Sequence, residues 1–165
     1  AGPAADVYND IRLDTPNMSA RMDNLRAAVL LSQLQQIETA IAGWNTRHDL
    51  VADMLGKSSA IHMPTRPGKE SYVGSSIQFC LPEISAKYAL EFVAWLAAAG
   101  VEVKWFGAPG PVGFTSDHHS WRYVAAQDLP QTDRILSGLF DMRLPLTFDL
   151  DDCAELVRHS HGSAC

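Results

Sequence analysis

The feature that most constrains the fold is an apolar stripe between Ala27 and Leu55. Its members are separated by alternating steps of three and four residues, which places them on one face of an α-helix. They are Ala27, Leu30, Leu34, Ile37, Ile41, Trp44, His48, Val51 and Leu55. The stripe predicts a long helix that packs against a core or, alternatively, against a partner helix in a coiled coil. Few flanking positions carry the alternating Glu and Lys residues that set coiled-coil pairing, which favours the core helix.

Two details refine this helix. Met22, Leu25 and Val29 lie off the stripe, which predicts that the N-terminal part of the helix is buried on two sides. Gly43 interrupts the pattern, and a glycine inside a helix costs about 1 kcal/mol relative to alanine. We therefore expect a kink or a helix break at Gly43.

The rest of the chain predicts a small sheet with helices. Two expected strands, 76–81 and 101–106, flank a helix that begins after Ser85 and ends at Gly100. The apolar residues of this helix that we expect to be buried are Tyr88, Ala89, Phe92, Val93 and Leu96. The later elements expected are a loop over 107–113, a short helix over 131–139, an extended stretch over 143–146 and a helix over 149–159.

The expected fold class is α/β, and more narrowly an α+β small domain. A long N-terminal helix or helix pair leads into a small sheet that two or three helices cover. We divide the chain into an N-terminal arm with its long helix, residues 1–56, and a small C-terminal domain, residues 57–165.

Composition argues against several kinds of partner. The 165 residues carry 13 basic and 19 acidic side chains, a formal charge of −6, and no Lys/Arg cluster, so a nucleic-acid surface is not expected. The longest apolar stretch is too short to cross a membrane, and the N-terminus lacks the features of a signal peptide. The cysteines at 80, 153 and 165 are odd in number and widely spaced, which is typical of a reduced, cytoplasmic protein.

Three residue groups suggest other chemistry but have the wrong spacing. The consecutive Ser, Asp and His at 116–118 cannot reach the geometry of a hydrolase triad. The glycines at 107, 110 and 113 alternate with prolines and indicate turns rather than a phosphate-binding loop. The Cys and His residues between 153 and 165 match no familiar zinc pattern, so no metal ligands are expected.

Two stretches carry the pattern of a known family. The first begins at Asn17, continues through Arg21-Met22 into a Leu- and Ala-rich segment, and is followed by Gln33-Leu34. The second is Leu144-Pro145-Leu146, followed by acidic residues and a terminal helix. Together they resemble the C-terminal, small-domain portion of the DegT/StrS sugar aminotransferases, which depend on pyridoxal 5'-phosphate (PLP). The family spacing is Asn-x-Arg-Met, whereas this chain has two additional residues before Arg21.

The resemblance implies a fold-type-I homodimer that transfers an amino group from Glu or Gln to a keto-sugar nucleotide or a similar keto acceptor. It implies that Asn17, together with Arg21, binds the cofactor phosphate of the neighbouring subunit. From the residues alone, Asn17 is better explained as a helix N-cap. The Schiff-base lysine belongs to a preceding domain that also binds most of the PLP, so this chain is expected to contain no catalytic residue. Its own four lysines are interpreted as solvated side chains.

The candidate substrate contacts are His118, His119 and Arg122. They lie in a segment rich in His and aromatic residues that follows a glycine-rich turn. Arg122 can pair with a carboxylate or a phosphate, and the resemblance places His118 or His119 near the mouth of the active site. The alternative is an ordinary exposed loop in which Arg122 forms a salt bridge with a nearby acid.

Two functions remain open at this point. In the first, the chain is the small domain of an aminotransferase, and its partner is a second copy or a complementary PLP-binding chain. In the second, it is a free-standing, non-catalytic dimerisation or regulatory module with the same fold. An isolated fragment of an enzyme should expose the apolar stripe from Ala27 to Leu55 and aggregate or dimerise, and a monodisperse monomer would count against this first function.

Overall fold

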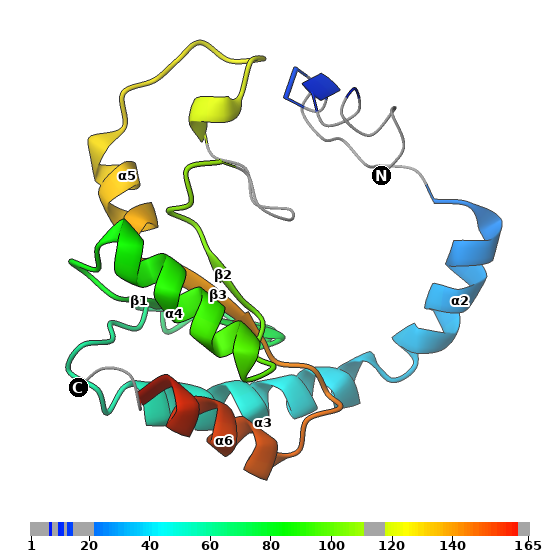
Figure 1. Cartoon of the computed structure of the whole chain (residues 1–165). Coiled ribbons are helices and arrows are strands. Elements are labelled where there is room, and N and C mark those ends of the chain that lie inside the picture. The colour runs from blue at the N-terminus through cyan, green and yellow to red at the C-terminus, as the bar shows by residue number, and fades with distance from the viewer. Residues whose placement is uncertain (1–6, 8–9, 12, 15–21, 111–117, 162–165) are drawn as a thin grey trace.

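The computed structural model describes the chain except for residues 1–6, 8–9, 12, 15–21, 111–117 and 162–165 (Figure 1). The helices are α2 (Asn24–Leu34), α3 (Ile37–Leu55), α4 (Ala86–Ala98), the short 3-10 helix η1 (His118–Ser120), α5 (Pro130–Ser137) and α6 (Leu150–His161). The strands are β1 (Ser76–Cys80), β2 (Val103–Trp105) and β3 (Leu139–Arg143). The expected α+β class is confirmed. Within this described part, none of the helices has both the length and the apolar character needed to cross a membrane.

The sheet has the strand order β1-β3-β2, and β3 is antiparallel to both neighbours. Its register aligns apolar residues into two rows across the three strands, on one face of the sheet. The rows are Ile77, Met142 and Val103, and Phe79, Phe140 and Trp105. All of these side chains are buried, so this face of the sheet packs against the core.

The opposite face carries polar residues at the intervening positions. Gln78 is the cross-strand partner of Asp141, which is also paired with Lys104. Asp141 is buried, with 5% of its surface exposed, although it is a carboxylate on a small sheet. Its place on the middle strand, between an amide and an ammonium side chain, explains how this acid is accommodated.

Helices from both ends of the described chain complete the core. Figure 1 shows α4 lying across the sheet and α3 running beside α6, which pack against one another. At the centre, the Phe140 ring stacks on Phe79 with centroids 5.6 Å apart and meets the edge of Phe92 at 5.4 Å. The buried residues that α3 and α6 add are His48, Val51, Leu55, Cys153, Leu156 and Val157.

The helix break lies at a different place from the one that we expected. The chain leaves α2 and enters α3 at Gln35-Gln36, whereas Gly43 lies within α3 and does not interrupt it. A Cβ atom at Gly43 would lie 3.1 Å from the Leu146 side chain, so the glycine allows close packing of that residue. Arg47 Nη1 also donates to the Gly43 carbonyl at 2.8 Å. The expectation of a kink at Gly43 is therefore wrong.

The expectation that the first part of the helix is buried on two sides is also wrong. None of the residues of α2 is buried, and Leu25 and Leu31 are 76% and 67% exposed. The stripe predicted from sequence faces the core only in α3, where His48, Val51 and Leu55 are buried. In Figure 1, α2 extends away from the sheet, which explains why its apolar residues find no cover among the described segments.

The central strand is the element that the sequence did not predict. The expected short helix over 131–139 ends earlier, at Ser137, and the residues between it and Arg143 form β3. The short segment offers few residues from which a period of two can be recognised, and its middle residue is the acidic Asp141. The strands at 76–81 and 101–106 and the helices on either side are confirmed with boundaries that shift by a few residues.

The helix ends follow local rules that the sequence does show. The Ser85 side chain accepts a hydrogen bond from the Tyr88 amide, which confirms Ser85 as the N-cap of α4. Gly100 follows α4 with φ +81°, a conformation that favours glycine. Asp149 and Asp152 accept from one another's backbone amides at the start of α6. Tyr88, which we expected to be buried, is 63% exposed, because it lies on the side of α4 that faces a cavity rather than the sheet.

Replacement of Phe140 by alanine tests the central position of β3. We expect Phe140→Ala to lower the free energy of unfolding by about 3–5 kcal/mol, because the ring is fully buried between two other rings. Leu90→Ala is the control, since Leu90 is 55% exposed, and its effect should stay within about 0.5 kcal/mol. Urea unfolding at equilibrium measures both, and equal effects would show that Phe140 is not at the centre of the core.

Candidate functional site

The residues proposed from the sequence fall into two groups. Asn17 and Arg21 lie outside the described residues. His118, His119 and Arg122 are described, and they belong to η1 and the segment that follows it. The consecutive residues of the rejected hydrolase triad reach into the undescribed range 111–117.

The two histidines converge on one carboxylate. His118 Nε2 and His119 Nε2 lie 3.3 Å and 3.2 Å from the same oxygen, Oδ1 of Asp133. The centroids of the two imidazole rings are 4.0 Å apart. The His118 side chain is 10% exposed, whereas those of His119 and Asp133 are 57% and 42% exposed. The turn of η1 and the first turn of α5 therefore bring three groups that can bind protons or metals to one place.

Arg122 is engaged with acids from the N-terminal segment. Its Nη2 donates to Asp10 Oδ1 at 2.6 Å, its Nη1 lies 3.5 Å from Asp14 Oδ2, and its backbone amide donates to the Leu13 carbonyl at 2.9 Å. The hydrogen bond and the positive charge of Arg122 hold the pKa of Asp10 below its usual range. The same contacts raise the pKa of Arg122. The alternative drawn from the sequence, a salt bridge between Arg122 and a nearby acid, is the arrangement that the structure has.

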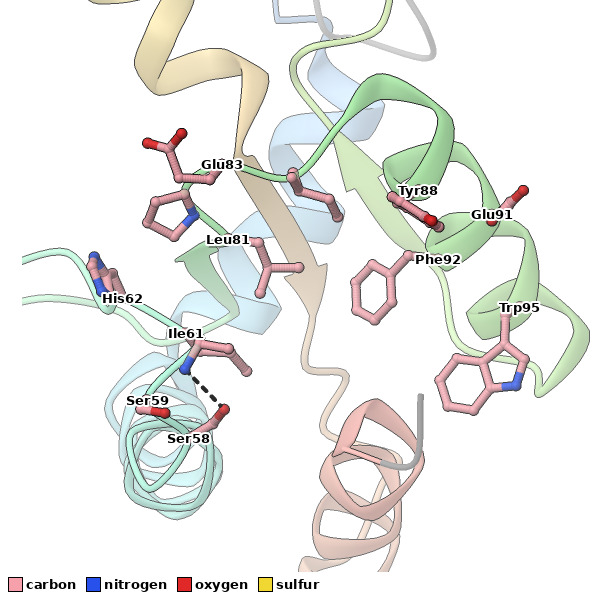
Figure 2. Close-up of a pocket in the computed structure, with 13 residues that line it drawn as sticks. Ser58, Ser59, Ile61, His62, Leu81, Glu83, Tyr88, Glu91, Phe92 and Trp95 are labelled. Atoms are coloured by element: carbon pink, nitrogen blue, oxygen red, sulfur yellow. Dashed lines mark hydrogen bonds between the residues drawn. The ribbon is translucent and has the colours of Figure 1, made fainter. Parts of the chain in front are cut away.

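A cavity of about 800 Å³ lies elsewhere, between α4, the end of β1 and the turn after α3 (Figure 2). Phe92 from α4 and Leu81 from the end of β1 point toward one another across it, and Trp95 lies at one side. Polar groups, including His62 and Glu91, stand at its rim. Its size suits a small organic ligand, but none of the residues that line it is a lysine or an arginine.

A third polar cluster attaches the segment before β1 to α3. Asn45 donates its amide to the Tyr72 carbonyl at 3.1 Å and accepts from the Gly74 amide at 2.8 Å. The Tyr72 hydroxyl donates to Asp49 Oδ1 at 2.5 Å, and this hydrogen bond raises the pKa of Tyr72. A Cβ atom at Gly74 would lie 2.5 Å from His48 Cβ, so only glycine allows this approach. The cluster explains local structure, and its groups are all used in holding this segment.

The described residues do not form a PLP site by themselves. Lys57, Lys69 and Lys87 are exposed, and Lys104 is half-buried on the polar face of the sheet. None of the four lines the cavity. A PLP enzyme requires a lysine that binds the cofactor covalently and groups that hold its phosphate, and this part of the chain does not bring them together.

The sequence identified the histidines and Arg122 but not their partners. Asp10 is separated from Arg122 by 112 residues, and Asp133 from His119 by 14. Nothing in the spacing of these acids marks them, because exposed acids are common in any chain. The cavity was also missed, since its walls come from three separate segments.

Comparison with solved structures gives the class of protein to which this fold belongs. The aminotransferase TlmJ from Streptoalloteichus hindustanus superposes with a TM-score of 0.67 at 12% identity, over 82% of this chain and 34% of that chain. The sugar aminotransferase CalS13 from Micromonospora echinospora gives 0.62 at 17% identity, over 78% of this chain and 32% of that chain. A DegT DnrJ EryC1 StrS aminotransferase from Brucella abortus gives 0.60 at 16% identity, over 96% and 43%. The fold is therefore that of part of an aminotransferase, and the chain spans well under half the length of these structures.

The family follows from the sequence. The family model for the DegT/DnrJ/EryC1/StrS aminotransferases matches residues 4–159, which is nearly all of the 165 residues. The chain belongs to this family, and the resemblance that the Asn17 and Leu144 regions carry is confirmed. None of the curated protein sequences compared with the chain matches it.

The Arg122 contacts predict a measurable change in the titration of Asp10. We expect Arg122→Gln to raise the pKa of Asp10 toward the ordinary value of an aspartate, because the donor and the charge that favour its ionised form are removed. The stabilisation from this pair is present at neutral pH and is lost as the pH falls through the lowered pKa of Asp10. The pKa of Asp10 is measured by NMR from the chemical shift of its carboxyl carbon as the pH is changed. The control Arg134→Gln removes an arginine that pairs with Glu83, and an equal response of Asp10 would contradict the assignment.

Proposed function

We propose that the chain is the C-terminal, small-domain portion of a PLP-dependent sugar aminotransferase, and that it works together with a PLP-binding domain that precedes it. The observation that carries this proposal is the family match over residues 4–159, combined with a length that covers only 32–43% of the aminotransferases described above. The exposed apolar residues of α2 support it, because they require a partner surface.

The proposed reaction is the transfer of an amino group from glutamate or glutamine to a keto-sugar nucleotide or a related keto acceptor. PLP supplies the electron sink for this chemistry when it is bound. The lysine that binds PLP would come from the preceding domain. This chain would cover the site and contact the acceptor, and its cysteine usage suggests that it does so in the cytoplasm.

Asn17 and Arg21 are the proposed contacts of this chain with the cofactor. In this proposal the enzyme is a homodimer, and the Asn17 amide donates to the cofactor phosphate of the neighbouring subunit. Arg21 stands four residues later, before α2, and would add a positive charge near the same phosphate. The proposed division into an arm (residues 1–56) and a small domain (57–165) assigns both residues to the arm.

His118, His119 and Arg122 are the proposed contacts with the acceptor. Their placement on η1 and the segment after it supports a shared role. Arg122 is 48% exposed at its side chain, so a carboxylate or phosphate of a substrate can replace Asp10 or Asp14 as its partner without burying a charge.

The second candidate is a non-catalytic dimerisation or regulatory module. The same exposure of α2 supports it, because an apolar helix can equally bind a second copy of this chain. The two candidates differ in whether a lysine-bearing domain belongs to the same polypeptide or complex.

The first test is the intact mass of the protein purified from its own reading frame and reduced with borohydride. We expect a chain heavier than 18.0 kDa that carries a phosphopyridoxyl group on a lysine outside these 165 residues. An unreduced sample, which should lose the group on denaturation, is the control. A single unmodified species of 18.0 kDa would contradict the proposed function and favour the module.

The second test concerns the 165-residue chain alone. We expect it to self-associate with rising concentration, because α2 exposes Leu25, Leu31 and neighbouring apolar residues. The double replacement Leu25→Glu with Leu31→Glu should restore a monomer in size-exclusion chromatography with light scattering. Gln33→Glu with Gln35→Glu adds the same charge at polar positions and should leave the association intact. A wild-type chain that is monomeric at every concentration would exclude α2 as an association surface.

A further inference from the structure

We propose that His118, His119 and Asp133 form a binding site for a divalent transition-metal ion of the Zn²⁺ type. Each of the three residues offers one ligand atom, and these atoms all lie within 4.8 Å of one another. The proposal concerns a ligand that the aminotransferase function does not require, and it goes beyond that function.

The separations between the Asp133 oxygen and the two imidazole nitrogens match those around a tetrahedral metal. Zn²⁺ holds imidazole nitrogen and carboxylate oxygen at about 2.0–2.2 Å, so two donors on adjacent corners of a tetrahedron lie about 3.3–3.5 Å apart. His118 Nε2 lies 3.3 Å from Asp133 Oδ1, and His119 Nε2 lies 3.2 Å from the same atom. All three ligand atoms lie within 4.8 Å of one another, so rotation of the side chains can bring them around one ion.

The chemistry of the donor set selects the class of metal. Imidazole nitrogen suits Zn²⁺, Co²⁺, Ni²⁺ and Cu²⁺, whereas Mg²⁺ and Ca²⁺ prefer all-oxygen sites. Two imidazoles and one carboxylate provide three protein ligands, which leaves a fourth position for water or for an oxygen atom of a small molecule. A metal at this site could therefore bind an exogenous ligand at its fourth position, unlike a structural metal whose four ligands all come from the protein.

The surroundings of the cluster give both rigidity and access. The His118 side chain is 10% exposed, which fixes one ligand within the protein. His119 and Asp133 are about half exposed, so an ion can reach the open side. Because residues 121–129, which join η1 to α5, form no helix or strand, an ion shared between η1 and α5 would cross-link two elements that otherwise meet through side chains.

The same geometry has a simpler explanation, in which one carboxylate forms polar contacts with two imidazole rings and no metal is involved. His119 Nε2 is within hydrogen-bond distance of Asp133 Oδ1. The two explanations differ in what they predict for added metal, because a cluster held only by these polar contacts gains nothing from Zn²⁺. They also differ in how the acceptor could bind. With a metal bound, both histidines would be metal ligands, and the acceptor could interact with the cluster only by occupying the open coordination position of the metal.

Titration with Zn²⁺ of the protein purified from its own reading frame, in an isothermal calorimeter, tests the proposal. We expect one ion per chain, and we expect Co²⁺ at the same site to show the visible absorption of a tetrahedral complex. Asp133→Asn keeps the shape of the side chain but removes the anionic ligand, and His119→Ala removes an exposed imidazole. Each should weaken binding at least about tenfold, since even changes to groups that only orient metal ligands have effects of this size.

Asp128→Asn is the matched control, because it makes the same chemical change at an exposed acid of the neighbouring segment. It should bind Zn²⁺ as the wild type does. Circular dichroism of each variant confirms that the fold is retained, and the exposed positions of His119 and Asp133 are chosen for this reason. Absence of binding in the wild type, or binding that persists in both Asp133→Asn and His119→Ala, would overturn the proposal. Neither result depends on aminotransferase activity, so the metal site and the proposed function are tested independently.

Discussion

The structure depends on the insertion of β3 between β1 and β2, two strands that precede it in the sequence. β1 and β2 do not pair with each other, and both pair with β3; among the described residues β1 also forms one bridge, between Cys80 and His62. The same insertion aligns the two apolar rows on which the helices pack, with Phe140 at the crossing of two aromatic contacts. Formation of the sheet and formation of the core are therefore one event, because the residues that complete the pairing also complete the buried face.

The sequence predicted the elements whose signals are local and missed those that depend on distant segments. Ser85 and Gly100 mark the ends of α4 through their own chemistry. β3 carries little local signal, because it is short and its middle residue is a carboxylate that only the neighbouring strands accommodate. We placed the helix break at Gly43 rather than at Gln35-Gln36, because the sequence does not show that Leu146, in the turn before α6, packs against Gly43. Burial of α2 was predicted from its apolar residues, but burial also requires a surface to pack against.

In the candidate site too, the sequence showed the residues with a local signal and missed the partners that lie far away in the chain. His118, His119 and Arg122 are conspicuous as residue types, but the sequence did not predict that the two histidines lie on the 3-10 helix η1. Their partners are acids at Asp133 and in the N-terminal segment, and the fold alone selects these from 19 acidic residues. The structure therefore shows each of these three side chains already next to an acid, with Arg122 beside Asp10 and the two imidazoles beside Asp133. Any ligand that binds there must compete with these acids or use them.

The packing of α6 on α3 determines when the hydrophobic core of this domain can be completed during synthesis. The face of α3 that carries Val51 and Leu55 is made early, but part of its cover, including Cys153 and Val157, is among the last of the described residues to leave the ribosome. Throughout that interval the nascent chain presents an open apolar surface, while any domain encoded upstream has had time to fold. α3 can therefore pack against β1 of its own chain, and against any other apolar surface within reach, before α6 exists.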